Sequence, residues 1–251
     1  MYRSISPKVF CIVAALLYIA NAYILGNDRV AGRDSWLCII LSALFYVPVF
    51  LLFYFLSKRY PGKNFFEITA DIFGKTIMKI VAVLYVIYGV LLLSMSFNCF
   101  ARFVSSNTLP DTPKYVMATA IALCATYLGK WASFVFHVVI LFIVISMLTS
   151  ITSFHFEYLF PVAENKHAVL IGAYRYLSFP FGEPIVVFSL LSKVKGRLEM
   201  RHWLIPWFLA TLILSLSFAR DTMVLGGSLS GMLSFSTNHA DSITGYTNFE
   251  Q

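Results

Sequence analysis

The chain has 251 residues, of which 59% are hydrophobic and only 12% charged, and its mean hydropathy is +0.78. A soluble domain would carry about twice that charged fraction, so the composition excludes an ordinary soluble protein and indicates a multispan membrane protein. The net charge of +7 is not evidence for nucleic-acid binding, because basic residues in membrane proteins mostly report the orientation of the chain.

Seven apolar runs are long enough, or nearly so, to cross a bilayer as helices, since about 20 residues span the hydrocarbon core. We expect spans at residues 9–25, 36–56, 77–97, 115–128, 132–148, 168–191 and 203–218. Asp34 is the expected N-cap of the second span, and Pro48 predicts a kink within it. Phe65–Phe73 is expected to form a short interfacial helix. The residues after Arg220 are Gly- and Ser-rich and only weakly apolar.

The basic residues are distributed unevenly between the two ends of these spans. With the N-terminus in the cytoplasm, 12 Lys and Arg residues lie on the cytoplasmic side and 7 on the other side. The two richest loops, at residues 58–75 and 193–201, both fall on the cytoplasmic side. Because cytoplasmic loops are enriched in Lys and Arg, we expect a cytoplasmic N-terminus.

The sixth run carries the cluster SFPFGEP in its middle, at residues 178–184. Two prolines remove backbone donors and a glycine permits unusual dihedral angles, so the helix is expected to break here. Lipid cannot satisfy the freed amides and carbonyls, and such a break persists only where it faces protein or a polar cavity. Discontinuous spanning helices of this kind hold small solutes in transporters. The alternative is a proline kink with Glu183 near an interface.

Three further polar residues lie inside apolar runs. Asn21 in the first run predicts either an interhelical hydrogen bond or an interruption of the helix. The first and sixth runs correspond in position if five spans are followed by a second set, which is the pattern of an inverted-repeat transporter site. Ser133 and His137 share one face of the fifth run. His137 is either a relay or coupling group or a neutral imidazole bonded to a neighbouring helix.

The sequence gives little support for chemical catalysis. It contains no Gly-rich phosphate loop, no His/Glu metal spacing and no nucleophile elbow. All four cysteines lie singly in apolar runs and are expected to be small buried hydrophobes. Asp34 and Asp221 are expected to be helix caps or interface charges. We therefore expect no enzymatic activity, no metal and no cofactor.

Several short motifs occur in an order and at a spacing that resemble the B subunits of spore germination receptors. They are AGRDSWL at residues 31–37, YPGK at 60–63, LPDTP at 109–113, FPV at 160–162, GA at 172–173, FGE at 181–183 and LG at 225–226. The resemblance covers nearly the whole chain. This family is a branch of the amino acid–polyamine–organocation superfamily. The resemblance implies an all-α integral membrane protein. Its fold would be an amino-acid-transporter-like bundle of two inverted five-helix repeats, with breaks in helices 1 and 6.

The resemblance also implies a germinant (nutrient) receptor subunit, a multi-pass protein of the spore inner membrane. It would work beside an A-type membrane subunit and a C-type lipoprotein, and a small amino-acid-like germinant would bind without chemical turnover. Freed amides at the first break would hold a carboxylate, and carbonyls at the sixth an ammonium group. Carried over by position, the ligand-binding residues would be Asn21, Ala22, Tyr23, Ser178, Phe179, Phe181, Gly182 and Glu183.

The chain departs from the family pattern in three respects. The family usually has a glycine near Asn21, and it often has a Gly-x-Glu and an Arg where this chain has GKW at residues 129–131. Family members are also longer, so we expect residues 1–154 to form a first repeat and residues 155–251 an incomplete second repeat, with about seven spans in all. Two alternatives to the receptor remain open: an ion-coupled amino acid permease, and a non-binding assembly subunit or inert truncated remnant.

Overall fold

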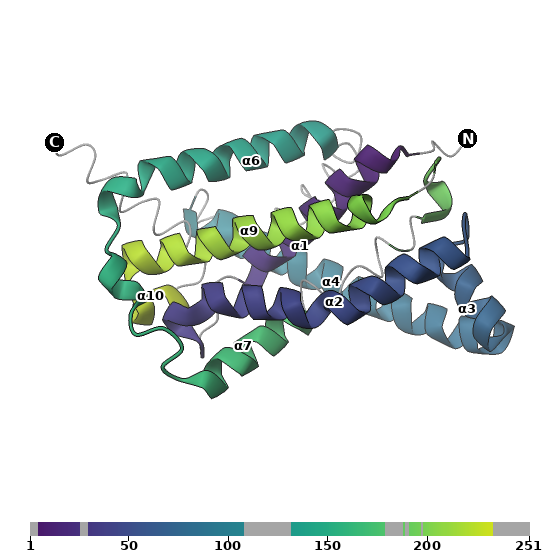
Figure 1. Ribbon diagram of the computed structural model, residues 1–251, viewed down its shortest axis with the longest axis horizontal. Coiled ribbons are helices and arrows are strands. Elements are labelled where there is room, and N and C mark those ends of the chain that lie inside the picture. Colours follow the sequence, from purple (N-terminus) through teal and green to yellow (C-terminus); the bar gives the residue numbers. More distant parts are fainter. Residues whose placement is uncertain are drawn as a thin grey trace.

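Helices make up almost all of the structure (Figure 1). The structure, a computed structural model, describes residues 5–25, 30–107, 132–178, 188, 191–196 and 198–232. Within these residues the only β interaction is an isolated bridge between Ile5 and Val194. The prediction of an all-α protein is confirmed.

The helices follow one another in the order of the predicted spans. They are α1 (Pro7–Leu25), η1 (Gly32–Asp34), α2 (Ser35–Arg59), α3 (Phe65–Phe73), α4 (Lys75–Asn107), α6 (Ala132–Thr149), η3 (Ile151–Ser153), η4 (Phe156–Leu159), α7 (Lys166–Ser178), η5 (Leu191–Lys193), α9 (Met200–Leu225) and α10 (Gly227–Met232).

Among the described residues, three helices are long and apolar enough to cross a membrane. They are Gly32–Arg59, Lys75–Ser96 and Met200–Leu225, and the shorter apolar helices are Pro7–Ala20 and Phe136–Thr149. The second, third and seventh predicted spans are thus confirmed as helices of spanning length. The first and fifth are helical, the sixth is helical as far as Ser178, and the fourth lies outside the described residues.

The short helix α3 has the predicted bounds, and its N-terminus explains why. The Asn64 side chain accepts a hydrogen bond from the Glu67 amide, and the Asn64 amide donates to the Glu67 carboxylate, which together form a capping box. The helix ends at Gly74, whose φ of 86° is readily adopted by glycine. Lys63 pairs with Asp71 on this helix, and that hydrogen bond raises the pKa of the Lys63 amine.

The core of the bundle is centred on α9. Both α1 and α2 pack along α9, while α2 also packs along α7. Ser215 of α9 donates to the Trp36 carbonyl at 3.3 Å, and the Cys38 thiol donates to the Val169 carbonyl at 3.4 Å. The core therefore joins helices from both sides of residue 154, the expected boundary between the repeats.

The connecting segments gather at the two ends of the bundle. At one end, on the left of Figure 1, α6 and α9 end and α2 begins. At the other end, the loop after α2 and the segment before α9 line a common pocket, with Ser57, Lys58, Tyr60, Pro61 and Gly62 on one side and Leu191, Val194, Gly196 and Leu198 on the other. The Ile5 backbone pairs with Lys193 and Lys195 at this end. The two loops richest in Lys and Arg thus come together at one end, which agrees with the prediction that both lie on the same side of the membrane.

Candidate functional site

The last turns of α1 carry three of the predicted ligand-binding residues. The helix is continuous from Pro7 to Leu25, so the expected unwinding at Asn21, Ala22 and Tyr23 is wrong. An Asn residue alone does not break a helix, because it keeps its backbone donor and has only moderately low helix propensity. Ala22 is fully buried, whereas the Asn21 side chain lies outside what the structure describes.

Tyr23 connects this end of α1 to α9. Its hydroxyl donates a hydrogen bond to Ser217 Oγ at 2.8 Å. Its ring meets the fully buried ring of Phe218 edge-on, with centroids 6.3 Å apart. On α7, Tyr176 contacts the same Phe218 ring at 5.8 Å. Phe218 therefore lies between the predicted site residue Tyr23 and the end of α7.

The end of α7 carries the remaining predicted residues. Ser178 is exposed, and its hydroxyl donates to the Tyr174 carbonyl one turn earlier at 3.0 Å. The other four predicted residues lie outside the described residues: Phe179, Phe181, Gly182 and Glu183. The structure thus brings Tyr23 and Tyr176 to a common aromatic ring, and the break expected in the sixth span stays a prediction.

The last three turns of α9 are buried on almost every face and contain an ion pair. Arg220 is 2% exposed and Asp221 is 0% exposed. The Arg220 guanidinium donates two hydrogen bonds to Asp221 Oδ1, from Nη2 at 2.7 Å and from Nε at 3.1 Å. Because α9 continues through both residues to Leu225, the expectation that Asp221 caps a helix is wrong. Its carboxylate is instead buried inside the bundle in an ion pair.

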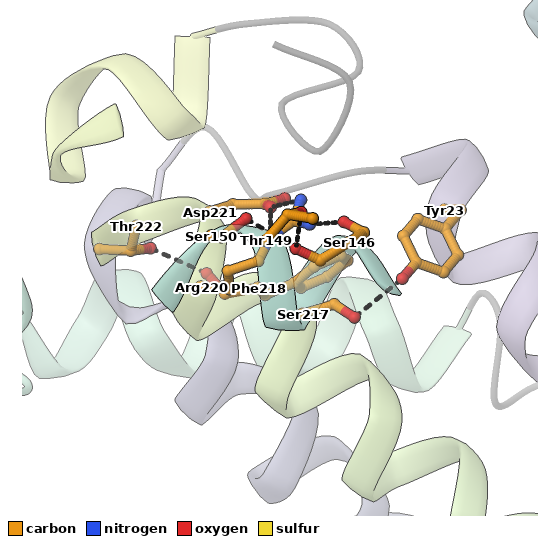
Figure 2. A network of polar contacts seen from close by, with 9 residues as sticks. All are labelled: Tyr23, Ser146, Thr149, Ser150, Ser217, Phe218, Arg220, Asp221 and Thr222. Carbon is orange, nitrogen blue, oxygen red and sulfur yellow. Dashed lines mark hydrogen bonds and ion pairs between the residues drawn. The ribbon is translucent and has the colours of Figure 1, made fainter. Parts of the chain in front are cut away.

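The ion pair is linked to α6 through Ser146 (Figure 2). Arg220 Nη1 donates to the Ser146 hydroxyl, and the Ser146 carbonyl accepts hydrogen bonds from the hydroxyls of Thr149 and Ser150. On α9, Ser217 lies one turn before the pair and accepts the hydrogen bond from Tyr23 of α1. A polar layer in which α1, α6 and α9 meet therefore crosses the bundle.

Burial makes this polar layer costly to build. Removing one partner of a buried ion pair typically costs about 3–5 kcal/mol, because the other charge is left without compensation. Ionisable groups inside membrane proteins are rare and mark ion or solute pathways. The sequence offers one signal for this buried pair, since the apolar residues Met223, Val224 and Leu225 continue the helix after Asp221.

Asp34 and His137, which the sequence also singled out, lie in different surroundings. Asp34 occupies the N-cap position of α2 but its side chain makes no capping hydrogen bond. Instead, its Oδ1 accepts from the Ala163 amide at 3.0 Å, which ties α2 to the segment before α7. His137 is exposed on α6, and the side chain of Ser133 lies outside what is described. In the described ranges, no group of three His, Cys, Asp or Glu residues is placed to hold a metal ion.

Comparison with known proteins identifies the family. The family model described as spore germination protein matches residues 4–237. Spore germination protein KB of Bacillus subtilis (strain 168) is 20% identical over 234 residues, which cover 88% of this chain and 63% of that protein. YfkT of the same strain, also named for spore germination, is 24% identical over 210 residues, which cover 79% of this chain and 57% of that protein.

The chain thus spans about three fifths of the length of these curated relatives. No solved structure matches it significantly. Its apolar helices agree with the permease-like character of the family. Because the family match extends over residues 4–237, the protein belongs to the spore germination protein family of membrane permeases.

Proposed function

We propose that the protein is a B-type germinant receptor subunit that binds a small amino-acid-like solute in the spore inner membrane and so triggers germination. The observation that carries this proposal is the family match over residues 4–237, and both curated relatives are named for spore germination. In this proposal the N-terminus is cytoplasmic, and the protein works beside an A-type membrane subunit and a C-type lipoprotein. The solute is bound and released without chemical turnover.

The proposed ligand site lies where the ends of α1 and α7 approach Phe218. It would use Asn21, Ala22 and Tyr23 on α1 together with the predicted residues of the sixth span, Ser178, Phe179, Phe181, Gly182 and Glu183. The last carbonyls of α1 are not used by the helix itself and carry partial negative charge, which favours an ammonium group. Tyr23 and Ser217 supply hydroxyls, and the Phe218 ring supplies an apolar wall.

A germination assay tests this proposal directly. In spores that carry Tyr23→Phe in place of the native chain, we expect a several-fold higher germinant concentration for half-maximal fall in optical density. The matched control is Tyr174→Phe, because Tyr174 is 67% exposed on α7 and its loss of a hydroxyl should leave the dose response unchanged. Spores lacking the gene should not respond to that germinant. An unaltered response in the deletion strain would contradict the receptor role.

An ion-coupled amino acid permease is the second candidate function, and the buried Arg220–Asp221 pair favours it. Intramembrane carboxylates that can change protonation are used for ion coupling in transporters. Membrane vesicles that accumulate a labelled amino acid, and lose this uptake with Asp221→Asn, would support the permease. Saturable binding without net uptake would support the receptor.

A further inference from the structure

A pocket opens at the end of the bundle where α6 and α9 end and α2 and α7 begin. Its volume is about 500 Å³, within the range typical of small-molecule sites. Three segments line it: residues 30–34 before α2, residues 157–168 leading into α7, and Gly227 at the start of α10. These segments are far apart in the sequence, so the pocket is a product of the folded bundle.

Direct contacts between these segments hold the pocket in shape. The Arg33 guanidinium donates to the Phe160 carbonyl at 2.8 Å and to Glu164 at 2.5 Å. The Asp34 side chain, which is almost fully buried, accepts a hydrogen bond from the Ala163 amide. Gly227 lies so close to Arg33 that a Cβ on Gly227 would be 2.5 Å from the Arg33 Cβ. The walls are therefore preformed, which lowers the conformational cost of binding a ligand.

The charges on the walls are mainly negative. Among the described lining residues, Arg33 provides one positive charge against three carboxylates, those of Asp34, Glu157 and Glu164. The guanidinium of Arg33 is already bonded to Glu164 and to a carbonyl oxygen. Glu157 is 71% exposed and lies 3.3 Å from His155, which is uncharged unless protonated. The electrostatic potential in the pocket thus favours a cation.

Two aromatic side chains at the pocket are exposed. Phe160 is 65% exposed and Tyr158 is 40% exposed, and both line the pocket beside Glu157. Aromatic faces attract organic cations through their quadrupole, and carboxylates nearby add Coulombic attraction. Aromatic rings and carboxylates together form a suitable binding site for an ammonium group.

We infer that this pocket binds a small solute that carries an ammonium group, such as an amine or an amino acid. The site is separate from the proposed site around Tyr23 and Phe218, because none of its described lining residues belongs to α1 or α9. The inference therefore does not depend on the germinant receptor role, and it can be tested on the isolated protein.

The test measures the binding of choline to the purified chain in a maltoside detergent, which has no ammonium headgroup to compete. Isothermal titration should show saturable binding of choline and at least fivefold weaker binding of 3,3-dimethyl-1-butanol, its neutral isostere. Glu157→Lys should weaken choline binding more than tenfold, because it replaces attraction with repulsion. Phe160→Leu should weaken it about two- to fivefold through loss of the cation–π interaction.

The matched control is Glu199→Lys at the opposite end of the bundle, where Glu199 is also exposed and is paired with Arg201. This variant should bind choline like the native chain. Both glutamates are exposed, so neither substitution should prevent folding, which circular dichroism would verify. Equal binding of choline and its neutral isostere overturns the inference, as does an unchanged dissociation constant for Glu157→Lys.

Discussion

Tyr23 on α1 and Ser217 on α9 are 194 residues apart in the sequence and are joined by a hydrogen bond of 2.8 Å. Ser217 is 2% exposed and Tyr23 is half-buried, so this bond is partly shielded from water. It places the end of α1 in the same polar layer as Arg220 and Asp221. A change at Tyr23 would therefore act on the contact between α1 and α9.

Removing the Tyr23 hydroxyl should weaken this contact. We expect Tyr23→Phe to lower the free energy of unfolding by about 0.6 kcal/mol, the average for hydrogen bonds between membrane helices. Ser217→Ala should have a similar effect, and the double variant should cost no more than the larger single one, since both remove one bond. Unfolding in mixed micelles of dodecyl sulfate and maltoside measures these changes. Additive effects would show that the two hydroxyls act independently.

The sequence predicts best what depends on local pattern. The apolar runs predict the spanning helices because a backbone in lipid must satisfy its own hydrogen bonds. The bounds of Phe65–Phe73 are predictable because Asn64 and Gly74 are local start and stop signals. Tyr23 is among the predicted site residues, but nothing in the sequence around Ser217 indicates that it is the partner of Tyr23. Tertiary packing decides which helix faces Tyr23.

Two wrong predictions have the same physical origin. The sequence pattern puts Arg220 and Asp221 at the end of an apolar run, because charged residues usually mark the membrane interface. Here each charge neutralises the other inside the bundle, so the helix continues through them to Leu225. The interruption predicted at Asn21 rests on the same assumption about polar residues. A polar side chain can be satisfied by a neighbouring helix without any change in its own backbone.

Labelling of single cysteines tests the orientation proposed from the charge distribution. In a background without native cysteines, Lys63→Cys and Lys195→Cys should resist an impermeant thiol reagent added outside intact cells. Glu157→Cys, at the other end of the bundle and 71% exposed in its side chain, should react. Permeabilised cells provide the control, because all three variants should then be labelled. The reverse pattern would place the N-terminus outside the cytoplasm.

The close approach of Gly227 to Arg33 makes a second prediction about packing. Gly227→Ala should lower the free energy of unfolding by about 1–3 kcal/mol, since the added methyl group would overlap the Arg33 side chain. Gly89→Ala on α4 is the control, because no atom beyond the adjoining turns of its own helix backbone and its two chain neighbours lies within 4 Å of the position that the new methyl group would occupy. That change should stabilise the protein by about 0.5–1 kcal/mol through the higher helix propensity of alanine. The two substitutions therefore have opposite expected signs in the same unfolding assay.

The buried pair of Arg220 and Asp221 allows the clearest test of whether it serves structure or function. Arg220→Met and Asp221→Leu should each destabilise the bundle by about 3–5 kcal/mol, because each leaves one buried charge without a partner. The double variant removes both charges and should recover most of that loss, so that its stability in detergent lies near the native value. Thermal unfolding of the four proteins gives the coupling energy. If the double variant is stable but spores that carry it no longer respond to germinant, the pair is retained for function. A native response in those spores would assign the pair to structure alone. If the double variant is as unstable as the single variants, then Ser146 and the other polar neighbours need the two charges as hydrogen-bond partners.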